Sequence, residues 1–175
     1  MNPHIPYILP LRGLSDGLHH FNYDIDDPFF QSFDDSPIQK ARIKMRVQLD
    51  KRPRLLVLDF NFSGTIQSIC DRCLTAIKLP INGDYQLLVK YGEEEAESDD
   101  DVIYIPQETG KWNIAQFVYE YILLAMPIIK VYDCENDDNP PCDFDLLDRL
   151  DETIPTEEEQ PKANPFKAAL ENWKK

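Results

Sequence analysis

Four cysteines are the residues of this sequence whose type and spacing point most directly to chemistry. Two of them, Cys70 and Cys73, lie in a Cys-x-x-Cys turn, which supplies two of the roughly four ligands of a tetrahedral zinc site. The other two, Cys134 and Cys142, are separated by seven residues, which is not a standard zinc-ribbon spacing. If the 133–142 loop folds over the strand end before Cys70, the sequence predicts a structural metal site, with zinc as the cofactor, formed by Cys70, Cys73, Cys134 and Cys142.

Two other interpretations of the Cys-x-x-Cys pair stay open. A thiol oxidoreductase would place the pair at the start of a helix, which lowers the thiol pKa. Here the pair follows a predicted strand and leads into LTAIKLPI, which looks extended. The third interpretation is two reduced cysteines packed at a hairpin. A structural disulfide is not expected, because we see neither a signal peptide nor a membrane-spanning segment, and we predict a cytoplasmic protein whose thiols stay reduced.

Groups suited to catalysis do not form a recognisable motif in this sequence. The three histidines, His4, His19 and His20, lie near the N-terminus, and the six glycines form no phosphate-binding loop. We therefore expect neither an enzyme nor a small-molecule substrate, and no contact with a membrane.

Basic residues are concentrated in one short segment of an acidic chain. The formal net charge is −14, so total charge does not favour nucleic acid. ARIKMRVQLD (41–50), however, alternates apolar and polar residues, which predicts a half-buried strand. This alternation places four cations on its solvent face, and we call them the basic stripe: Lys40, Arg42, Lys44 and Arg46. The stripe is either a local phosphate-binding surface or an ordinary solvated strand face. The second interpretation is favoured because no aromatic residues lie between these cations to stack on bases.

These candidate residues require a β-rich body to position them. We predict strands over 5–11, 17–25, 41–50, 55–68, 85–91 and 102–105, with a bulge at Gly64 and a solvated acidic loop over 93–101. One helix is predicted over 113–126, capped by Asn113 with Gln116 reaching back. The fold class is α+β: an antiparallel sheet or partly closed barrel with one main core helix and a short C-terminal amphipathic helix. The predicted domain covers 1–150.

The last part of the chain, 151–175, is predicted to be an acidic tether ending in a helical hook. In NPFKAALENWKK, Phe166, Leu170 and Trp173 share one helical face. This face is a candidate partner-binding surface, and it docks either on the protein's own body or on a partner.

Four blocks in this order resemble the YceD family of large ribosomal RNA subunit accumulation proteins. The blocks are CDRC at 70–73, EYILLAMPIIKVYD at 120–133, Cys142, and the terminal NPFKAALENWKK. The resemblance implies a cytoplasmic protein linked to accumulation of the large-subunit (23S) ribosomal RNA, with no catalytic residues. The residues of this chain that correspond to residues of the family pattern are Cys70, Arg72, Cys73, Glu120 and Cys142. Relatives often carry a histidine where this chain has Tyr132, and tyrosine is a poor zinc ligand. Cys134, two residues later, would then take the place of that histidine as a zinc ligand.

The function predicted from the sequence is a non-enzymatic ribosome-assembly factor that promotes accumulation or maturation of large-subunit ribosomal RNA. Its partners would be that RNA, through Lys40, Arg42, Lys44, Arg46 and Arg72, or ribosomal proteins, through the acidic loops and the hook. The alternative is an acidic protein-interaction adaptor with a structural cysteine site and no RNA contact.

Overall fold

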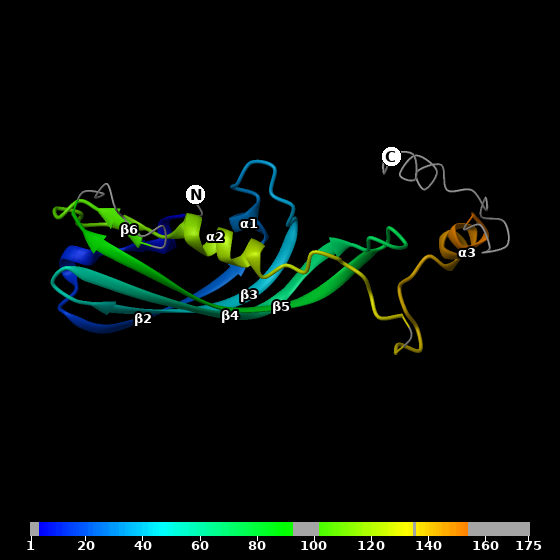
Figure 1. Cartoon of the computed structure of the whole chain (residues 1–175), viewed down its shortest axis with the longest axis horizontal. Helices are drawn as coiled ribbons and strands as arrows, with labels where there is room; N and C mark the ends of the chain where they lie inside the picture. Colours follow the sequence, from blue (N-terminus) through cyan, green and yellow to red (C-terminus); the bar gives the residue numbers. More distant parts are fainter. Residues whose placement is uncertain (1–3, 93–101, 135, 154–175) are drawn as a thin grey trace, which may run out of the picture.

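A computed structural model describes residues 4–92, 102–134 and 136–153, without the side chains of 151–153. Figure 1 shows a long, twisted five-stranded sheet in the order β2-β3-β4-β5-β6, beside a two-stranded sheet of β1 and β7. The strands are β1 (Ile8–Leu9), β2 (Gly17–Asp26), β3 (Lys40–Lys51), β4 (Leu55–Ile69), β5 (Ala76–Tyr91), β6 (Val102–Ile105) and β7 (Trp112–Asn113). The α-helices are α1 (Asp27–Phe30), α2 (Ala115–Leu124) and α3 (Phe144–Thr153), and two 3-10 turns cover Ile5–Tyr7 and Leu11–Gly13.

Strand β3 has the half-buried alternation that its sequence predicts. Its five inward side chains, from Ala41 to Leu49, are at most 5% exposed, while every basic residue of the stripe between them is exposed. β3 pairs antiparallel with β2 on one side and β4 on the other. The strands predicted over 17–25, 41–50, 55–68 and 102–105 are therefore confirmed, and β5 begins nine residues before the predicted start at Tyr85.

Helices cover one face of the sheet and leave the other open to solvent. In Figure 1, α1 and α2 lie on the same side of β3, β4 and β5. Ile114, Val118 and Ile122 are fully buried there, and the ring of Tyr121 stacks on that of Tyr85 at 4.8 Å. A second stack joins Phe33 to Tyr119, with ring centroids 4.0 Å apart. Such aromatic pairs add to the apolar area buried under α2 and fix it to the sheet.

The start of α2 follows only part of the capping prediction. The side chain of Asn113 accepts a hydrogen bond from the N–H of Ala115 at 2.9 Å, as expected. Gln116 does not reach back, and its amide donates to Glu120 at 2.8 Å instead. These two residues are four apart on an exposed helix face, where such side chains are neighbours.

Three details of the predicted sheet are wrong. Gly64 is not a bulge, because β4 stays in continuous register with both neighbours, with Gly64 opposite Ile43 and Ile81. The segment 5–11 is mostly 3-10 turn around the two residues of β1. β6 pairs in parallel with β5, so the sheet is mixed rather than wholly antiparallel.

The α+β class is confirmed, whereas a partly closed barrel is not. Within the described residues the five-stranded sheet is open, with β2 and β6 at its edges. Helix α3 lies in an acidic segment for which the sequence analysis predicts no helix. No helix of the described part of the chain is long and apolar enough to cross a membrane. The acidic loop 93–101 and the hook, with Phe166, Leu170 and Trp173, fall outside the described residues.

Gly64 provides a test of the close approach between β3 and β4. A Cβ atom at this position would lie 2.2 Å from the backbone oxygen of Arg42 and 2.6 Å from Cα of Ile43. Because backbone atoms cannot rotate away, we expect Gly64→Ala to lower the free energy of unfolding by about 1–3 kcal/mol or more. Urea denaturation measures this change. Gly13→Ala is the control, because nothing lies within 4 Å of its added Cβ, and an equal loss in both variants would contradict the argument.

Candidate functional site

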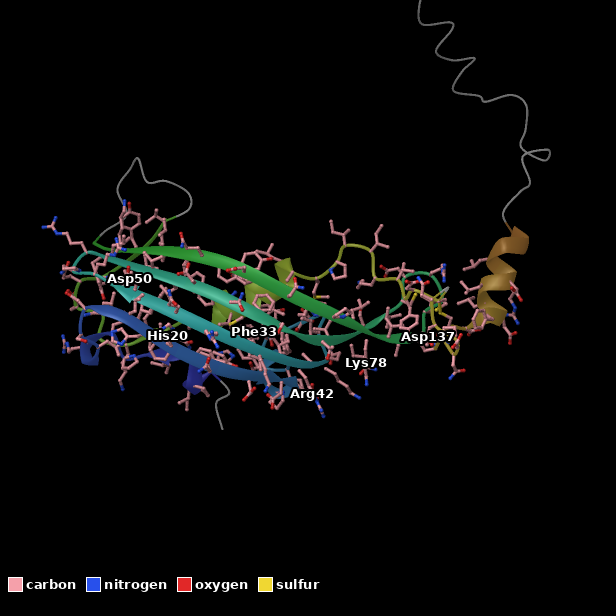
Figure 2. All side chains as sticks on the ribbon, turned by 90° about the horizontal axis from the view of Figure 1, so that it is seen from below. His20, Phe33, Arg42, Asp50, Lys78 and Asp137 are labelled. Carbon is pink, nitrogen blue, oxygen red and sulfur yellow. A yellow bond between two sulfur atoms is a disulfide. The ribbon has the colours of Figure 1, made fainter. Side chains whose placement is uncertain are left out.

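The basic stripe lies on the open face of the sheet, opposite the helices. Lys40, Arg42, Lys44 and Arg46 are all exposed, and Figure 2 looks onto this face, with Arg42 and Lys78 labelled on its right half. Successive stripe residues are two positions apart on β3, which spaces their Cα atoms by about 6.6–6.8 Å. The strand therefore presents a straight row of four positive charges to solvent.

Hydrogen-bonding side chains of the neighbouring strands border the stripe. Across from Arg46, Lys44, Arg42 and Lys40, β4 places in turn Asn61, Ser63, Thr65 and Gln67. Lys78 of β5 lies opposite Gln67 and adds a fifth cation to this end of the face. On the other side, Asp24 and Asp26 of β2 lie opposite Lys44 and Arg42. The stripe thus has an uncharged, polar border on β4 and an acidic border on β2.

The stripe cations differ from the other basic residues of the same segment in their pairing. Lys51 forms an ion pair with Asp16 at 3.0 Å, and Arg52 forms one with Asp50 at 2.6 Å. Within the described part of the chain, neither the stripe nor Lys78 takes part in any ion pair. Their charges are therefore available to an anionic ligand, since no internal carboxylate has to be displaced.

Two open hollows follow one another along this face, and a third lies beside them at the end of the β4–β5 hairpin. The first, of about 440 Å³, is lined by Lys44, Arg46, Asn61 and Ser63 among others. The second, of about 480 Å³, is lined by Lys40, Arg42, Gln67 and Lys78 among others. The third, of about 400 Å³, shares Lys40 and Gln67 with the second and reaches Lys130. A backbone with repeated phosphates suits such a row better than one compact ligand does, because the hollows are shallow and the charges are spread.

The Cys-x-x-Cys pair forms the turn at the end of that hairpin. Cys70 and Cys73 are free thiols and at most 1% exposed. The turn is closed by hydrogen bonds from the N–H of Cys70 to the carbonyl of Thr75 at 2.9 Å and from the N–H of Leu74 to the carbonyl of Cys70 at 3.0 Å. Leu74 adopts a left-handed backbone with φ of 59°. The prediction that this pair follows a strand and leads into extended chain is confirmed.

A segment after α2 is clamped onto this turn by the side chain and backbone of Asp71. The N–H of Lys130 donates to Oδ2 of Asp71 at 2.7 Å, and the N–H of Asp71 donates to the carbonyl of Lys130 at 2.7 Å. The Lys130 ammonium lies 3.8 Å from Oδ1 of the same carboxylate. We call these three contacts the Asp71–Lys130 clamp, and they place residues 130–134 beside the cysteines.

The environment of Cys70 lowers the pKa of its thiol. Burial raises its pKa, but hydrogen bonds from the backbone N–H groups of Cys73, Tyr132 and Arg72, together with the Cys73 thiol, lower the pKa to about 7. A lowered pKa is one requirement of the oxidoreductase interpretation. A second requirement, a helix starting at the pair, is not met, because the pair lies in a β-hairpin turn.

The second cysteine pair is joined by a disulfide between Cys134 and Cys142, so the expectation that all thiols stay reduced is wrong here. Arg72, which the sequence predicts as an RNA contact, donates a hydrogen bond from Nη2 to Sγ of Cys134 at 3.0 Å. Its side chain therefore contacts the disulfide. With the disulfide closed, the described residues contain no group of three or more His, Cys, Asp or Glu arranged for a metal. The zinc site of Cys70, Cys73, Cys134 and Cys142 therefore stays a prediction.

Some residues of this site were not singled out from the sequence. Lys78 lies in no motif, and Asp71 and Lys130 lie in blocks whose resemblance to the family rests on other residues. Strand pairing brings Lys78 to the site, and the clamp joins Asp71 to Lys130. Alternation within β5 would have placed Lys78 on the same face as the stripe, had the strand been recognised before Tyr85. Glu120 lies on the exposed face of α2, bonded to Gln116.

Comparison with known proteins gives one match. A family model described as "Large ribosomal RNA subunit accumulation protein YceD" matches residues 58–174, about two thirds of the chain. The chain belongs to the YceD family. No curated protein and no solved structure matches it.

The matched region of the YceD family does not include the whole site. It begins in β4, so it covers all four cysteines, the clamp, Lys78 and α2, and it also covers the three hook residues. β2 and β3, with the basic stripe, precede it. The cysteine end of the hairpin is thus the part of the site that the family model describes, and the stripe is a feature of this chain beside it.

Removing the carboxylate of Asp71 tests the clamp. In Asp71→Ala the Lys130 amide loses its acceptor, and we expect its hydrogen exchange to become about 10-fold faster, since a partly exposed hydrogen bond of this kind contributes about 1–1.5 kcal/mol. Exchange measured by NMR or mass spectrometry reports this locally. Asp84→Ala is the matched control, because Asp84 is an exposed β5 carboxylate without a hydrogen bond in the described structure. Unchanged protection of residues 130–134 would contradict the clamp.

Proposed function

We propose that this protein is a non-enzymatic factor that binds the phosphate backbone of large-subunit ribosomal RNA during assembly of the large ribosomal subunit, in the cytoplasm. The observation that carries the proposal is a row of cations on the open face of the sheet that form no ion pair with the described residues: Lys40, Arg42, Lys44, Arg46 and Lys78. Membership of a family named for accumulation of the large ribosomal RNA subunit supports the choice of RNA as the ligand.

The proposed contact is electrostatic and carries little sequence preference. The lining residues of the three hollows include Lys, Arg, Asn, Ser, Thr and Gln side chains, which contact phosphate and sugar groups in nucleic-acid complexes. Aromatic rings such as that of Tyr85 point to the opposite face of the sheet, where α2 covers them. The stripe therefore has no aromatic side chain beside it on which a base could stack. The net charge of −14 repels polyanions elsewhere, which confines the contact to the stripe.

A second candidate function, a protein-interaction adaptor, is favoured by exposed apolar side chains near the cysteine turn. Ile128 is 96% exposed, Ile129 71%, Leu74 67% and Ile69 59%. Ile128 and Ile129 directly precede Lys130 of the clamp, and Ile69 and Leu74 flank the Cys-x-x-Cys pair, so the four lie at one end of the molecule. An exposed cluster of this type is a common feature of protein-binding surfaces.

Sedimentation of a gentle, low-salt lysate separates these functions. We expect the protein to co-migrate with precursors of the large subunit, and we expect Arg42→Gln/Lys44→Gln/Arg46→Gln to move it to the top of the gradient. Ile128→Ser/Ile129→Ser would have that effect if the adaptor function is correct. Co-migration that is lost only in the apolar variant would overturn the RNA proposal.

Salt dependence of binding to large-subunit ribosomal RNA tests the stripe directly. Each phosphate contact adds about 0.7–0.9 to the slope of log affinity against log salt, so the triple Gln variant should lower the magnitude of the slope by about 2–3. The matched control is Arg54→Gln/Lys90→Gln/Lys111→Gln, which removes the same charge from exposed positions away from the stripe. Equal losses in the two variants would mean that only total charge matters.

A further inference from the structure

The sulfur of Cys70 lies between two segments of the chain that both donate hydrogen bonds to it. Three backbone N–H groups, from Cys73, Arg72 and Tyr132, donate to its sulfur, and such donors offset the negative charge that a zinc-bound sulfur retains. Two of them come from the Cys-x-x-Cys turn, where the left-handed conformation of Leu74 curls the chain back. The third comes from the opposite segment, so the sulfur lies between the two pieces of chain.

The second cysteine pair is brought to the same end of the hairpin by contacts independent of any sulfur pairing. Tyr132, which donates to Cys70, is two residues from Cys134, and the Asp71–Lys130 clamp fixes the start of this segment. Arg72 spans the gap to Sγ of Cys134 at 3.0 Å. Cys142 packs against the buried core that contains Cys70 and Cys73.

The state of the disulfide determines whether the sulfurs of Cys134 and Cys142 are available as metal ligands. Only a thiolate binds zinc strongly, and Cys134 and Cys142 have no thiolate while they are joined to each other. We propose that Cys70, Cys73, Cys134 and Cys142 form a redox-gated zinc site, which binds one Zn²⁺ when the Cys134–Cys142 disulfide is reduced and releases it when the disulfide closes.

The chemistry of the switch balances with a dithiol as the reductant. The dithiol supplies two electrons and two protons, the bond between Sγ of Cys134 and Sγ of Cys142 breaks, and the reductant becomes a disulfide. The reverse step uses a small-molecule disulfide as the oxidant. This oxidant accepts two electrons from the sulfurs of Cys134 and Cys142 and two protons from solvent, its own S–S bond breaks to give two thiols, and the Cys134–Cys142 bond forms as Zn²⁺ leaves. Zn²⁺ then forms bonds to the four cysteine sulfurs and displaces their protons to solvent, without any change in the oxidation state of the metal. Thiolate ligands select zinc over magnesium and calcium, which prefer oxygen.

Metal uptake by the purified full-length protein in two redox states is the test. After reduction with a dithiol and its removal without oxygen, we expect one zinc per chain, and we expect Co²⁺ in its place to show the intense charge-transfer bands of tetrahedral thiolate coordination. The oxidised protein should bind at least about 100-fold more weakly. No uptake by the reduced protein, or equal uptake in both states, would overturn the proposal.

Variants identify the ligands. Cys134→Ser/Cys142→Ser removes the disulfide and two ligands together, and its zinc affinity should be at least about 100-fold below that of the reduced protein. Tyr132→Phe is the control, because it keeps the backbone N–H that donates to Cys70 and all four sulfurs. Circular dichroism checks folding of each variant, and if the double variant does not fold, the Co²⁺ spectrum of the reduced protein gives the thiolate count. Zinc affinity that survives in a folded double variant, or fewer than four thiolates in that spectrum, would overturn the ligand set. RNA binding by the stripe is not part of either readout, so the zinc proposal and the proposed function fail independently.

Discussion

All twelve residues of β3 pair with β4, and ten of them pair with β2, without a bulge on either side. This register is the constraint on which the rest of the structure depends. Because side chains alternate along a strand, a slip by one residue would bury Lys40, Arg42, Lys44 and Arg46 and expose the apolar set between them. Burying four unpaired cations would cost far more than any local contact recovers. The core therefore fixes the position of every stripe charge.

The covering of only one face gives the sheet two different uses. α1 and α2 seal the inner face with aromatic stacks such as that of Tyr85 on Tyr121, so the inner face supplies stability. The outer face carries no helix in Figure 1, and along the stripe it presents polar and charged side chains. The chain has a net charge of −14, and yet five cations on one face form no ion pair with the described residues, so this face has a positive local potential. Such an arrangement favours one orientation of approach for an anionic partner over all others.

Local periodicity explains which parts of the fold could be predicted from the sequence. The alternation from Ala41 to Leu49 and the apolar face of α2 are strong patterns within one element, and both are confirmed. The sequence indicates extended chain over LTAIKLPI but predicts a strand only from Tyr85, whereas β5 runs unbroken through Pro80, which faces out. The parallel pairing of β6 with β5 depends on the path of the chain between these two strands. The residue pattern within either strand does not predict that path. α3 was missed because its acidic residues read as loop.

The candidate site was predictable in its residue types and not in its contacts. Alternation alone placed the stripe on one face, but Lys78 and Lys130 join that surface only through pairing with β4 and through the clamp. The cysteines show the same limit. Their number and the Cys-x-x-Cys turn suggest four ligands, whereas the structure joins Cys134 to Cys142 and leaves Cys70 and Cys73 free.

The outer face and the cysteine end are physically continuous, and this continuity joins the part of the chain that the family model matches to the part that precedes it. Lys40 and Gln67 line two adjacent hollows, and the second of these reaches Lys130, whose backbone is bonded to Asp71 of the cysteine turn. A change that loosens the turn thus moves Lys130 relative to the stripe, whereas β3 itself is fixed by its register. The strand that carries the stripe precedes the matched region, and the cysteine end lies within it. An anionic partner that contacts both parts would therefore meet one surface, in which strand register positions the stripe and the Asp71–Lys130 clamp positions Lys130.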